Sequence, residues 1–237
     1  MAIETPAPLG KATAATRAYE RLRRDIVTGR LAPGRKLGID FLSERYGAGA
    51  IPIREALNRL ASDGLVTRHD QRGFFVATVG IDDWRELVMT RCWAESQALE
   101  VSIANRDQAW EESIVLAAHR LSRTPFTLSE DLFDLNPDWE ARHREFHMAL
   151  LSRCGSSYLL RFCEDLMNKA ERYRYLADSK VYASRRRDDE HRGIMDAAID
   201  GDGDRAVTLL REHYSLSLAV AERAVPEFLG IARQPAS

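Results

Sequence analysis

Gly49-Ala50-Ile51-Pro52-Ile53-Arg54-Glu55-Ala56-Leu57-Asn58-Arg59-Leu60 is a segment whose apolar side chains recur with the period of a helix. Pro52 is favoured at the first position of a helix because it lacks a backbone N–H, so we expect a helix to begin there. One face is apolar and should be buried: Ile53, Ala56, Leu57, Leu60 and, beyond the helix, Leu65. The other face is polar and should point outward: Arg54, Glu55, Asn58 and Arg59.

Two further helices are predicted ahead of this segment. Residues 14–28 carry apolar side chains at helical spacing, and Gly29 then supplies a C-terminal stop. After a turn at Pro33-Gly34, residues 41–46 fall in a short helix that Gly47 closes. Two short helices around a glycine-bearing turn predict a helix-turn-helix.

A β-hairpin is predicted directly after these helices. Residues 65–69 (LVTRH) and 74–78 (FFVAT) are rich in β-branched and aromatic side chains, which are typical of strands. Residues 70–73 join them as a tight tip. A hairpin behind the second helix of a helix-turn-helix is a wing.

This order of motifs resembles the GntR family of bacterial regulators. The family pattern is a helix ending in Gly, then Leu-x-Pro-Gly-x-x-Leu, then Pro-x-Arg-Glu-Ala-Leu-x-x-Leu, then Gly-Leu-Val and a glycine in the wing. The matching residues of this chain are Gly29, Leu31, Pro33, Gly34, Leu37, Pro52, Arg54, Glu55, Ala56, Leu57, Leu60, Gly64, Leu65, Val66 and Gly73. The resemblance implies that the second helix reads the major groove of operator DNA.

The chain departs from the family pattern immediately before Pro52. The family usually has Ser-Arg-Thr there, with side chains that contact DNA, whereas this chain has Gly-Ala-Ile. We therefore expect its operator to differ from the usual family sequence. The predicted DNA-binding residues are Arg54, Gly49, Ala50, Ile51, Asn58, Gln71 and Arg72.

These residues are expected to make different kinds of contact. The free N–H groups of the helix N-terminus suit a phosphate, Ile51 suits a thymine methyl group, and Gln71 and Arg72 suit the minor groove. Arg54 is the principal expected contact, and an ion pair with a neighbouring acid is its alternative. For Arg45 and Arg59, a solvated face and a phosphate contact are both open.

Length and charge indicate two domains. A chain of 237 residues suits one small and one medium domain, predicted at 13–78 and 81–225. Residues 1–78 carry 13 Lys/Arg and 8 Asp/Glu, a net charge of +5, whereas the remainder is acidic. A basic N-terminal module joined to an acidic one fits a DNA reader attached to a domain that does not touch DNA.

Composition also indicates the compartment. No apolar run approaches the roughly 20 residues that cross a bilayer, so no membrane association is expected. The three cysteines have neither metal nor redox spacing, and their odd number argues against a disulfide framework. We expect a reducing compartment, hence a cytoplasmic protein.

Beyond Gly80 the pattern is helical throughout. Breaks fall near Arg106, Pro125, Pro137, Gly155, Ser179 and 201–203, which predicts six to seven helices packed as a bundle. The predicted fold class is therefore mostly α: an N-terminal winged helix-turn-helix followed by an all-α bundle.

Histidines are concentrated in this helical part. His143 and His147 are four residues apart, so their side chains share one face of a helix. His191 and His213 lie within later helices. Imidazoles from facing helices suit a divalent transition metal such as zinc or nickel, which makes all four candidate ligands. His69 and His119 are interpreted as structural.

The helical part resembles the FCD-type ligand-binding domain of the FadR branch of the GntR family. The landmarks are Arg91, Glu95, Phe146, His147, Leu150, Arg172, Tyr173, Arg174, Glu190, His191, Ala206 and His213. In metal-binding members of the family, the ligands are an Asp, a His four residues after it, and two further histidines. The resemblance therefore implies that His147, His191 and His213 are metal ligands. His143 occupies the Asp position. The alternative is that the histidines, partly protonated, bind an anionic effector directly.

Arginines provide a second expectation for this domain. Arg91 resembles an arginine of the family that points into the bundle and donates two hydrogen bonds to a ligand carboxylate. The alternative role for Arg91 is an intrahelical ion pair with Glu95. The predicted effector-binding residues are Arg91, His147, His191 and His213. Arg172 and Arg174 are two apart on a helix, so at least one is expected at the surface or in a dimer contact.

Finer detail resembles one subgroup, the carbon-starvation-induced repressor type. The segments RYGAGAIPIREAL, DQRGFFVA, HREFHMALLSRCGSSYLL and ERYRYL carry this likeness. That subgroup also lacks Ser-Arg-Thr and also has His before the Phe-His pair. It implies a small organic acid as effector, namely a dicarboxylate such as glutarate.

Three functions follow from these features. The first is a ligand-responsive DNA-binding regulator, not an enzyme, which acts as a homodimeric repressor released by a carboxylate. The second is a metal-dependent enzyme whose bundle histidines activate water, which leaves the basic module unexplained. The third is a constitutive DNA-binding protein, favoured if the histidines and Arg91 pack on apolar side chains with no cavity between them.

Overall fold

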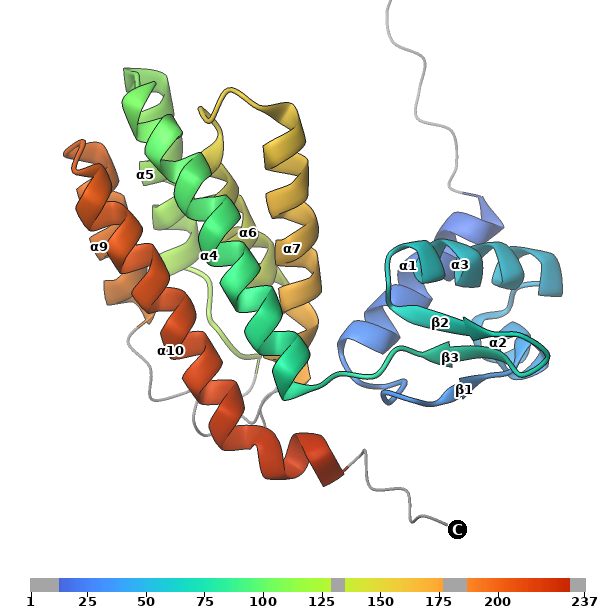
Figure 1. Ribbon diagram of the computed structural model, residues 1–237. Helices are drawn as coiled ribbons and strands as arrows, with labels where there is room; N and C mark the ends of the chain where they lie inside the picture. Colours follow the sequence, from blue (N-terminus) through green and yellow to red (C-terminus); the bar gives the residue numbers. More distant parts are fainter. Residues whose placement is uncertain (1–12, 129–134, 177–186, 231–237) are drawn as a thin grey trace, which may run out of the picture. The chain divides into compact units, whose positions relative to one another are not determined.

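The computed structural model describes residues 13–128, 135–176 and 187–230 (Figure 1). The chain divides into two compact units, Met1–Thr78 and Val79–Ser237. The first unit combines helices with a small sheet, and the described residues of the second are almost entirely helical. The predicted fold class is confirmed.

The N-terminal unit is a winged helix-turn-helix. Its elements are α1 (Ala14–Val27), β1 (Lys36–Leu37), α2 (Ile39–Tyr46), α3 (Ala50–Ser62), β2 (Val66–His69) and β3 (Gly73–Val76). α1 packs on α3, and the side chains predicted for the apolar face of α3 are all buried. α3 begins at Ala50 and not at Pro52 as predicted. The N–H groups of the whole first turn lack intrahelical partners, so proline is tolerated at its third residue as well.

The wing contains one more strand than the sequence predicted. β2 and β3 form the expected antiparallel hairpin, with Val66 opposite Val76 and His69 opposite Gly73. β1 pairs with the other edge of β3, which gives the order β1-β3-β2. A strand of two residues has no detectable period in the sequence, so its pairing follows only from the position of β3.

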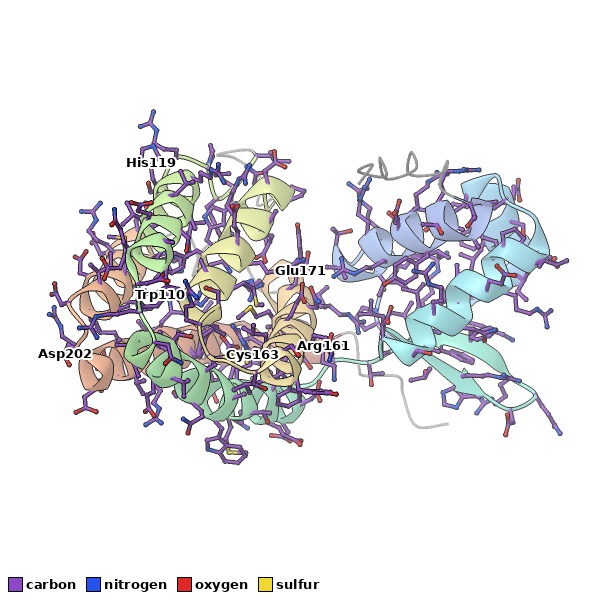
Figure 2. The ribbon with its side chains drawn as sticks, turned by 90° about the horizontal axis from the view of Figure 1, so that it is seen from above. Trp110, His119, Arg161, Cys163, Glu171 and Asp202 are labelled. Atoms are coloured by element: carbon purple, nitrogen blue, oxygen red, sulfur yellow. The ribbon has the colours of Figure 1, made fainter. Side chains whose placement is uncertain are left out.

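The C-terminal unit is a helical bundle. Six helices lie in its described residues, within the predicted six to seven: α4 (Ile81–Ala104), α5 (Gln108–Ser122), α6 (Pro137–Leu151), α7 (Ser157–Leu176), α9 (Arg187–Ile199) and α10 (Gly203–Gly230). α4 packs against α7 and α10, and α5 packs against α6 and α9. The break expected at Ser179 lies outside the described residues. Figure 2 shows Trp110 and Cys163 inside this unit and His119 at its outer edge.

One prediction about α7 is wrong. Arg172 and Arg174 are both buried, although they project from nearly opposite sides of the helix, about 160° apart. α7 is covered by α4 on one side and α6 on another, so two different faces of it lie inside the unit. Burial lowers the pKa of Arg172 to about 10, although Tyr173 and Asp83 raise it.

Cys92, Cys154 and Cys163 are free thiols in the structure. None of the described helices is long and apolar enough to cross a membrane.

Candidate functional site

The exposed face of α3 presents the side chains predicted to contact DNA. Arg54 and Asn58 are exposed one helical turn apart. No acidic side chain among the described residues pairs with Arg54, so the alternative of an ion pair is not found. The guanidinium therefore remains available for a base edge or a phosphate.

The N-terminus of α3 is open. Gly49 is the N-cap residue and makes no side-chain capping bond, and Gly49 and Ala50 are both exposed. Ile51 is 74% exposed. Free backbone N–H groups beside an exposed apolar side chain suit a phosphate and a thymine methyl group.

Two other arginines of this unit are engaged in packing. Arg45 donates to Asp25 at 3.0 Å, and Tyr46 donates to the same carboxylate at 2.7 Å, so α2 is tied to α1. The Arg59 guanidinium lies 4.1 Å from the ring centroid of Tyr19. Tyr19 in turn donates to Asp63. These contacts give both arginines a structural role that the sequence did not indicate.

The wing tip has an unusual backbone conformation. Gln71 has φ +60° and Gly73 has φ +90°, and Gln71 and Arg72 are both exposed. A positive φ is rare for a residue such as glutamine, and it lets the chain reverse over the three residues 70–72 between β2 and β3. The turn therefore presents both predicted wing residues to solvent.

The C-terminal unit brings four histidines together. His143 and His147 from α6, His191 from α9 and His213 from α10 are all buried, and one ring nitrogen of each lies within 4.8 Å of the others. His143 Nε2 is 3.1 Å from His147 Nε2. Trp139 stacks on His143 with 4.6 Å between ring centroids. His69 and His119 lie outside this cluster.

The outer nitrogens of two imidazoles are held by polar partners. His213 Nδ1 lies 2.8 Å from Glu190 Oε2, and His147 Nδ1 lies 3.3 Å from the hydroxyl of Tyr214. An Nδ1–H that donates outward leaves the Nε2 lone pair directed inward. Burial, reinforced by the neighbouring histidines and arginines, lowers the pKa of His143 and of His147 well below the usual value. Both rings are therefore neutral at pH 7, the form that binds metal.

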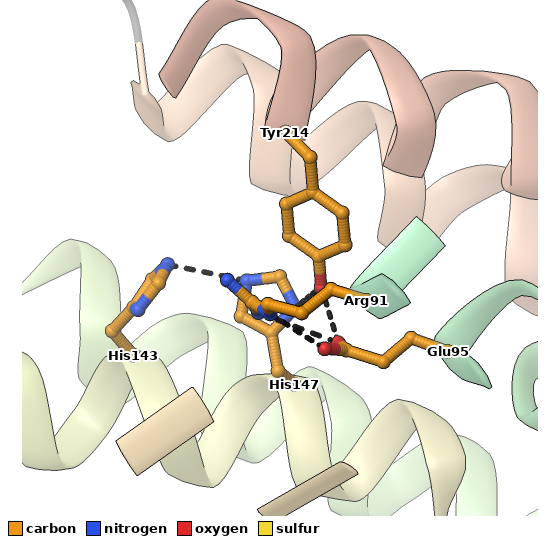
Figure 3. A network of polar contacts seen from close by, with 5 residues as sticks. All are labelled: Arg91, Glu95, His143, His147 and Tyr214. Atoms are coloured by element: carbon orange, nitrogen blue, oxygen red, sulfur yellow. Dashed lines mark hydrogen bonds and ion pairs between the residues drawn. The ribbon is translucent and has the colours of Figure 1, made fainter. Parts of the chain in front are cut away.

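A buried polar network connects these histidines to α4. Arg91 Nε donates to Glu95 Oε1 at 2.7 Å, and the Tyr214 hydroxyl donates to the other carboxylate oxygen (Figure 3). The Arg91 guanidinium also lies 4.2 Å from the Tyr214 ring centroid. The intrahelical pair of Arg91 and Glu95 is thus present, and Arg91 still borders the histidine cluster.

A small cavity opens beside the cluster. It is lined by Trp84, Val88, Arg91, Trp139, His143, Arg174, Arg187, His213, Tyr214 and Ser217. About 10 Å³ of it admits the centre of a water molecule, which is room for roughly one water. Arg174, Arg187 and Trp139 were not predicted as site residues. Their positions depend on the packing of α6, α7 and α9, and only the Arg-Tyr-Arg motif indicated Arg174.

Comparison with known proteins identifies both units. The family model for bacterial regulatory proteins of the gntR family matches residues 14–76, and the FCD domain model matches residues 86–216. This chain belongs to the GntR family. The GntR match covers the winged helix-turn-helix, and the FCD match contains all four clustered histidines and Arg91.

Two curated relatives extend over nearly the whole of this GntR regulator. The HTH-type transcriptional regulator BphR of Paraburkholderia xenovorans is 38% identical over 92% of this chain and 90% of its own length. The HTH-type transcriptional repressor GlaR of Escherichia coli is 32% identical over 87% of this chain and 95% of its own length. Among solved structures, a GntR regulator from Rhodococcus sp. RHA1 has a TM-score of 0.67 at 24% identity, covering 89% of this chain and 98% of its own. The likeness to that structure concerns the fold.

The biochemical class of this GntR protein follows from these findings. It is a DNA-binding transcription regulator with an FCD effector-binding domain, and its relatives are regulators and not enzymes. The metalloenzyme interpretation is set aside for this reason. The condition stated for a constitutive protein is not met, because the histidines contact one another and border a cavity.

Proposed function

We propose that this protein is a repressor that a small dicarboxylate releases from operator DNA, with the acid bound next to a metal ion held by the four histidines. The observation that carries the proposal is the convergence of four buried imidazoles beside a cavity lined by arginines. Arg54, Asn58, the open N-terminus of α3 at Gly49, Ala50 and Ile51, and the wing residues Gln71 and Arg72 would contact the operator. A regulator of this kind acts in the cytoplasm, where bacterial DNA is located.

The donor set fits a divalent transition metal. His143, His147, His191 and His213 would hold it, and all four nitrogens are close enough to share one ion. Buried polar groups are costly unless they are paired, and a metal ion would satisfy inward-directed lone pairs. Zinc closes its coordination with four ligands, whereas nickel retains positions for further donors. The metal would supply positive charge for an anionic effector.

The size of the cavity bears on how the acid acts. Room for about one water does not admit a five-carbon acid such as glutarate, so side chains of the lining must move when it binds. Arg91 is held by Glu95 and is positioned to exchange that partner for an effector carboxylate. A ligand shifts an equilibrium only through different affinities for two states, and displacement of these side chains would provide that difference.

We also propose that the protein binds DNA as a homodimer. A two-fold pair of recognition helices spaced by about 34 Å would match one turn of a near-palindromic operator. Support comes from Met89 and Trp93, which lie one turn apart on α4 and are 47% and 64% exposed. Light scattering of the purified protein would test the oligomeric state.

A thermal-shift screen with operator binding as a second readout tests the proposal. The full chain is examined before and after chelation, with Zn²⁺ or Ni²⁺, and with four- to six-carbon dicarboxylates including glutarate. A ligand that prefers the folded state raises the melting temperature by mass action. We expect a shift that needs metal and acid together, and loss of operator binding under the same conditions.

The alternative outcomes separate the parts of the proposal. An acid-induced shift in chelated protein would favour direct binding by Arg91 and the histidines. No shift with any acid would contradict the effector class. His147→Ala should retain operator affinity and lose the response, whereas His119→Ala, at an exposed position of α5 outside the cluster, should retain both.

A further inference from the structure

We propose that Arg174 binds the second carboxylate of the effector and thereby selects dicarboxylates over monocarboxylates. This inference rests on the proposed function of the cavity, and it assigns specificity to a residue outside the histidine and Arg91 set. The carboxylate distal to the histidines would receive charge-assisted hydrogen bonds from the guanidinium of Arg174, whose Nε and Nη2 also donate to Glu140.

The cavity is lined by guanidinium groups. Three of its lining residues are arginines, Arg91, Arg174 and Arg187, and no Asp or Glu is among the described residues that line it. Glu95 and Glu140, which pair with two of these arginines, are not part of the lining. Both carboxyl groups of a short diacid are ionised at pH 7. A cavity with this lining offers a separate guanidinium to each carboxylate, and Arg91 and Arg174 would then share their donors between the acid and their glutamate partners.

Arg174 is the arginine whose geometry is most constrained. Its Nε donates to Glu140 Oε1 at 2.6 Å and its Nη2 donates to Glu140 Oε2 at 2.7 Å, and both residues are buried. Glu140 lies on α6 one turn before His143, so the same helix positions the histidine and the carboxylate that holds Arg174. Arg174 and the histidine cluster are therefore kept in fixed relation, which is what discrimination by length and charge requires.

The other two arginines are less suited to this role. Arg91 lies against Tyr214 and Glu95, next to His147, and serves the carboxylate nearest the histidines. Arg187 packs its guanidinium 3.5 Å from the ring centroid of Phe126 and is only half-buried. A monoacid of the same length would place a methyl group against Arg174 and Glu140 and would make no hydrogen bond with them.

The test compares two probes of equal length, glutarate and pentanoate, by isothermal titration calorimetry of the full chain in the metal state that the thermal screen selects. Wild-type protein should bind glutarate at least tenfold more tightly. The double variant Arg174→Gln, Glu140→Gln leaves no unpaired buried charge. It should reduce the ratio of glutarate affinity to pentanoate affinity toward one, with the affinity for pentanoate retained. Arg174→Lys keeps the charge without the fork and should give an intermediate ratio.

Arg144→Gln provides a matched control. Arg144 also joins α6 to α7, through an ion pair with Glu171 at 3.2 Å, but it does not line the cavity. The ratio of glutarate affinity to pentanoate affinity in this variant should therefore equal that of the wild type. An unchanged ratio in the Arg174 variants, or a loss confined to Arg187→Gln, would overturn the inference. Equal binding of glutarate and pentanoate by the wild-type protein would overturn this inference. The proposal that an organic acid is the effector would still hold. Binding of neither acid would reject the proposed function and this inference together.

Discussion

The Nε2 atoms of His143 and His147 lie 3.1 Å apart on successive turns of α6. Two imidazole nitrogens bound to one tetrahedral zinc, each at about 2.0–2.1 Å, are separated by roughly 3.3 Å. The pair is thus spaced as two ligands of one ion. In the metal-free protein the same spacing requires that one ring donates to the other.

His143→Asp should strengthen binding of a divalent metal. The substitution places a carboxylate at the position that, by resemblance, holds Asp in metal-binding members of the family, and its negative charge attracts the ion in a buried site. We expect about a tenfold lower dissociation constant for Zn²⁺, measured by competition with a chelating dye. The metal-free variant should melt at a lower temperature, because a carboxylate is then buried without its partner. His69→Asp is the control, and equal affinity in both variants would contradict the assignment of His143.

Tyr214→Phe should weaken metal binding without loss of any proposed ligand. The pKa of Tyr214 is raised well above its usual value, chiefly by burial, so its hydroxyl remains protonated, donates to Glu95 and leaves a lone pair for His147. Removal of a group that orients a ligand typically costs 10- to 100-fold in metal affinity. Competition titration provides the measurement. If affinity were unchanged, the orientation of His147 would not depend on Tyr214.

Arg54→Ala should weaken operator binding by about 1–3 kcal/mol, the usual cost of a lost arginine contact to a base. Fluorescence anisotropy with a duplex obtained by in vitro selection would measure the loss. Arg59→Ala should have a smaller effect, because that guanidinium packs on Tyr19. Wild-type affinity in the Arg54 variant would show that α3 is not the recognition helix.

Arg72→Ala should lower affinity to a similar degree for every sequence. An exposed wing arginine that neutralises one phosphate releases about one counterion, so the slope of log affinity against log salt should decrease by about 1. Titrations at several salt concentrations, with the selected operator and with random DNA, separate this effect from base readout. A loss confined to the operator would instead assign base recognition to Arg72.

Local patterns were sufficient to predict the winged helix-turn-helix and part of the histidine cluster. The buried face of α3 and the hairpin of the wing follow from residue periodicity, because neighbouring turns of a helix or paired strands are set by short-range geometry. His143 and His147 could be placed together for the same reason, since four residues complete one turn. His191 and His213 were candidate ligands because they lie in helices of the same bundle, and the family resemblance supported them, but the sequence did not place their meeting point, because it depends on how α9 and α10 pack.

The remaining features depend on contacts between residues far apart in the chain. Arg174 reaches Glu140 across 34 positions, Tyr214 reaches Glu95 across 119, and Arg45 reaches Asp25 between two helices. A charged residue in a sequence shows neither its partner nor its burial, and the prediction that at least one of Arg172 and Arg174 is exposed was therefore wrong. Periodicity indicates which face of a helix is apolar, whereas the packing of α4, α6 and α7 around one another determines which polar side chains are enclosed with them.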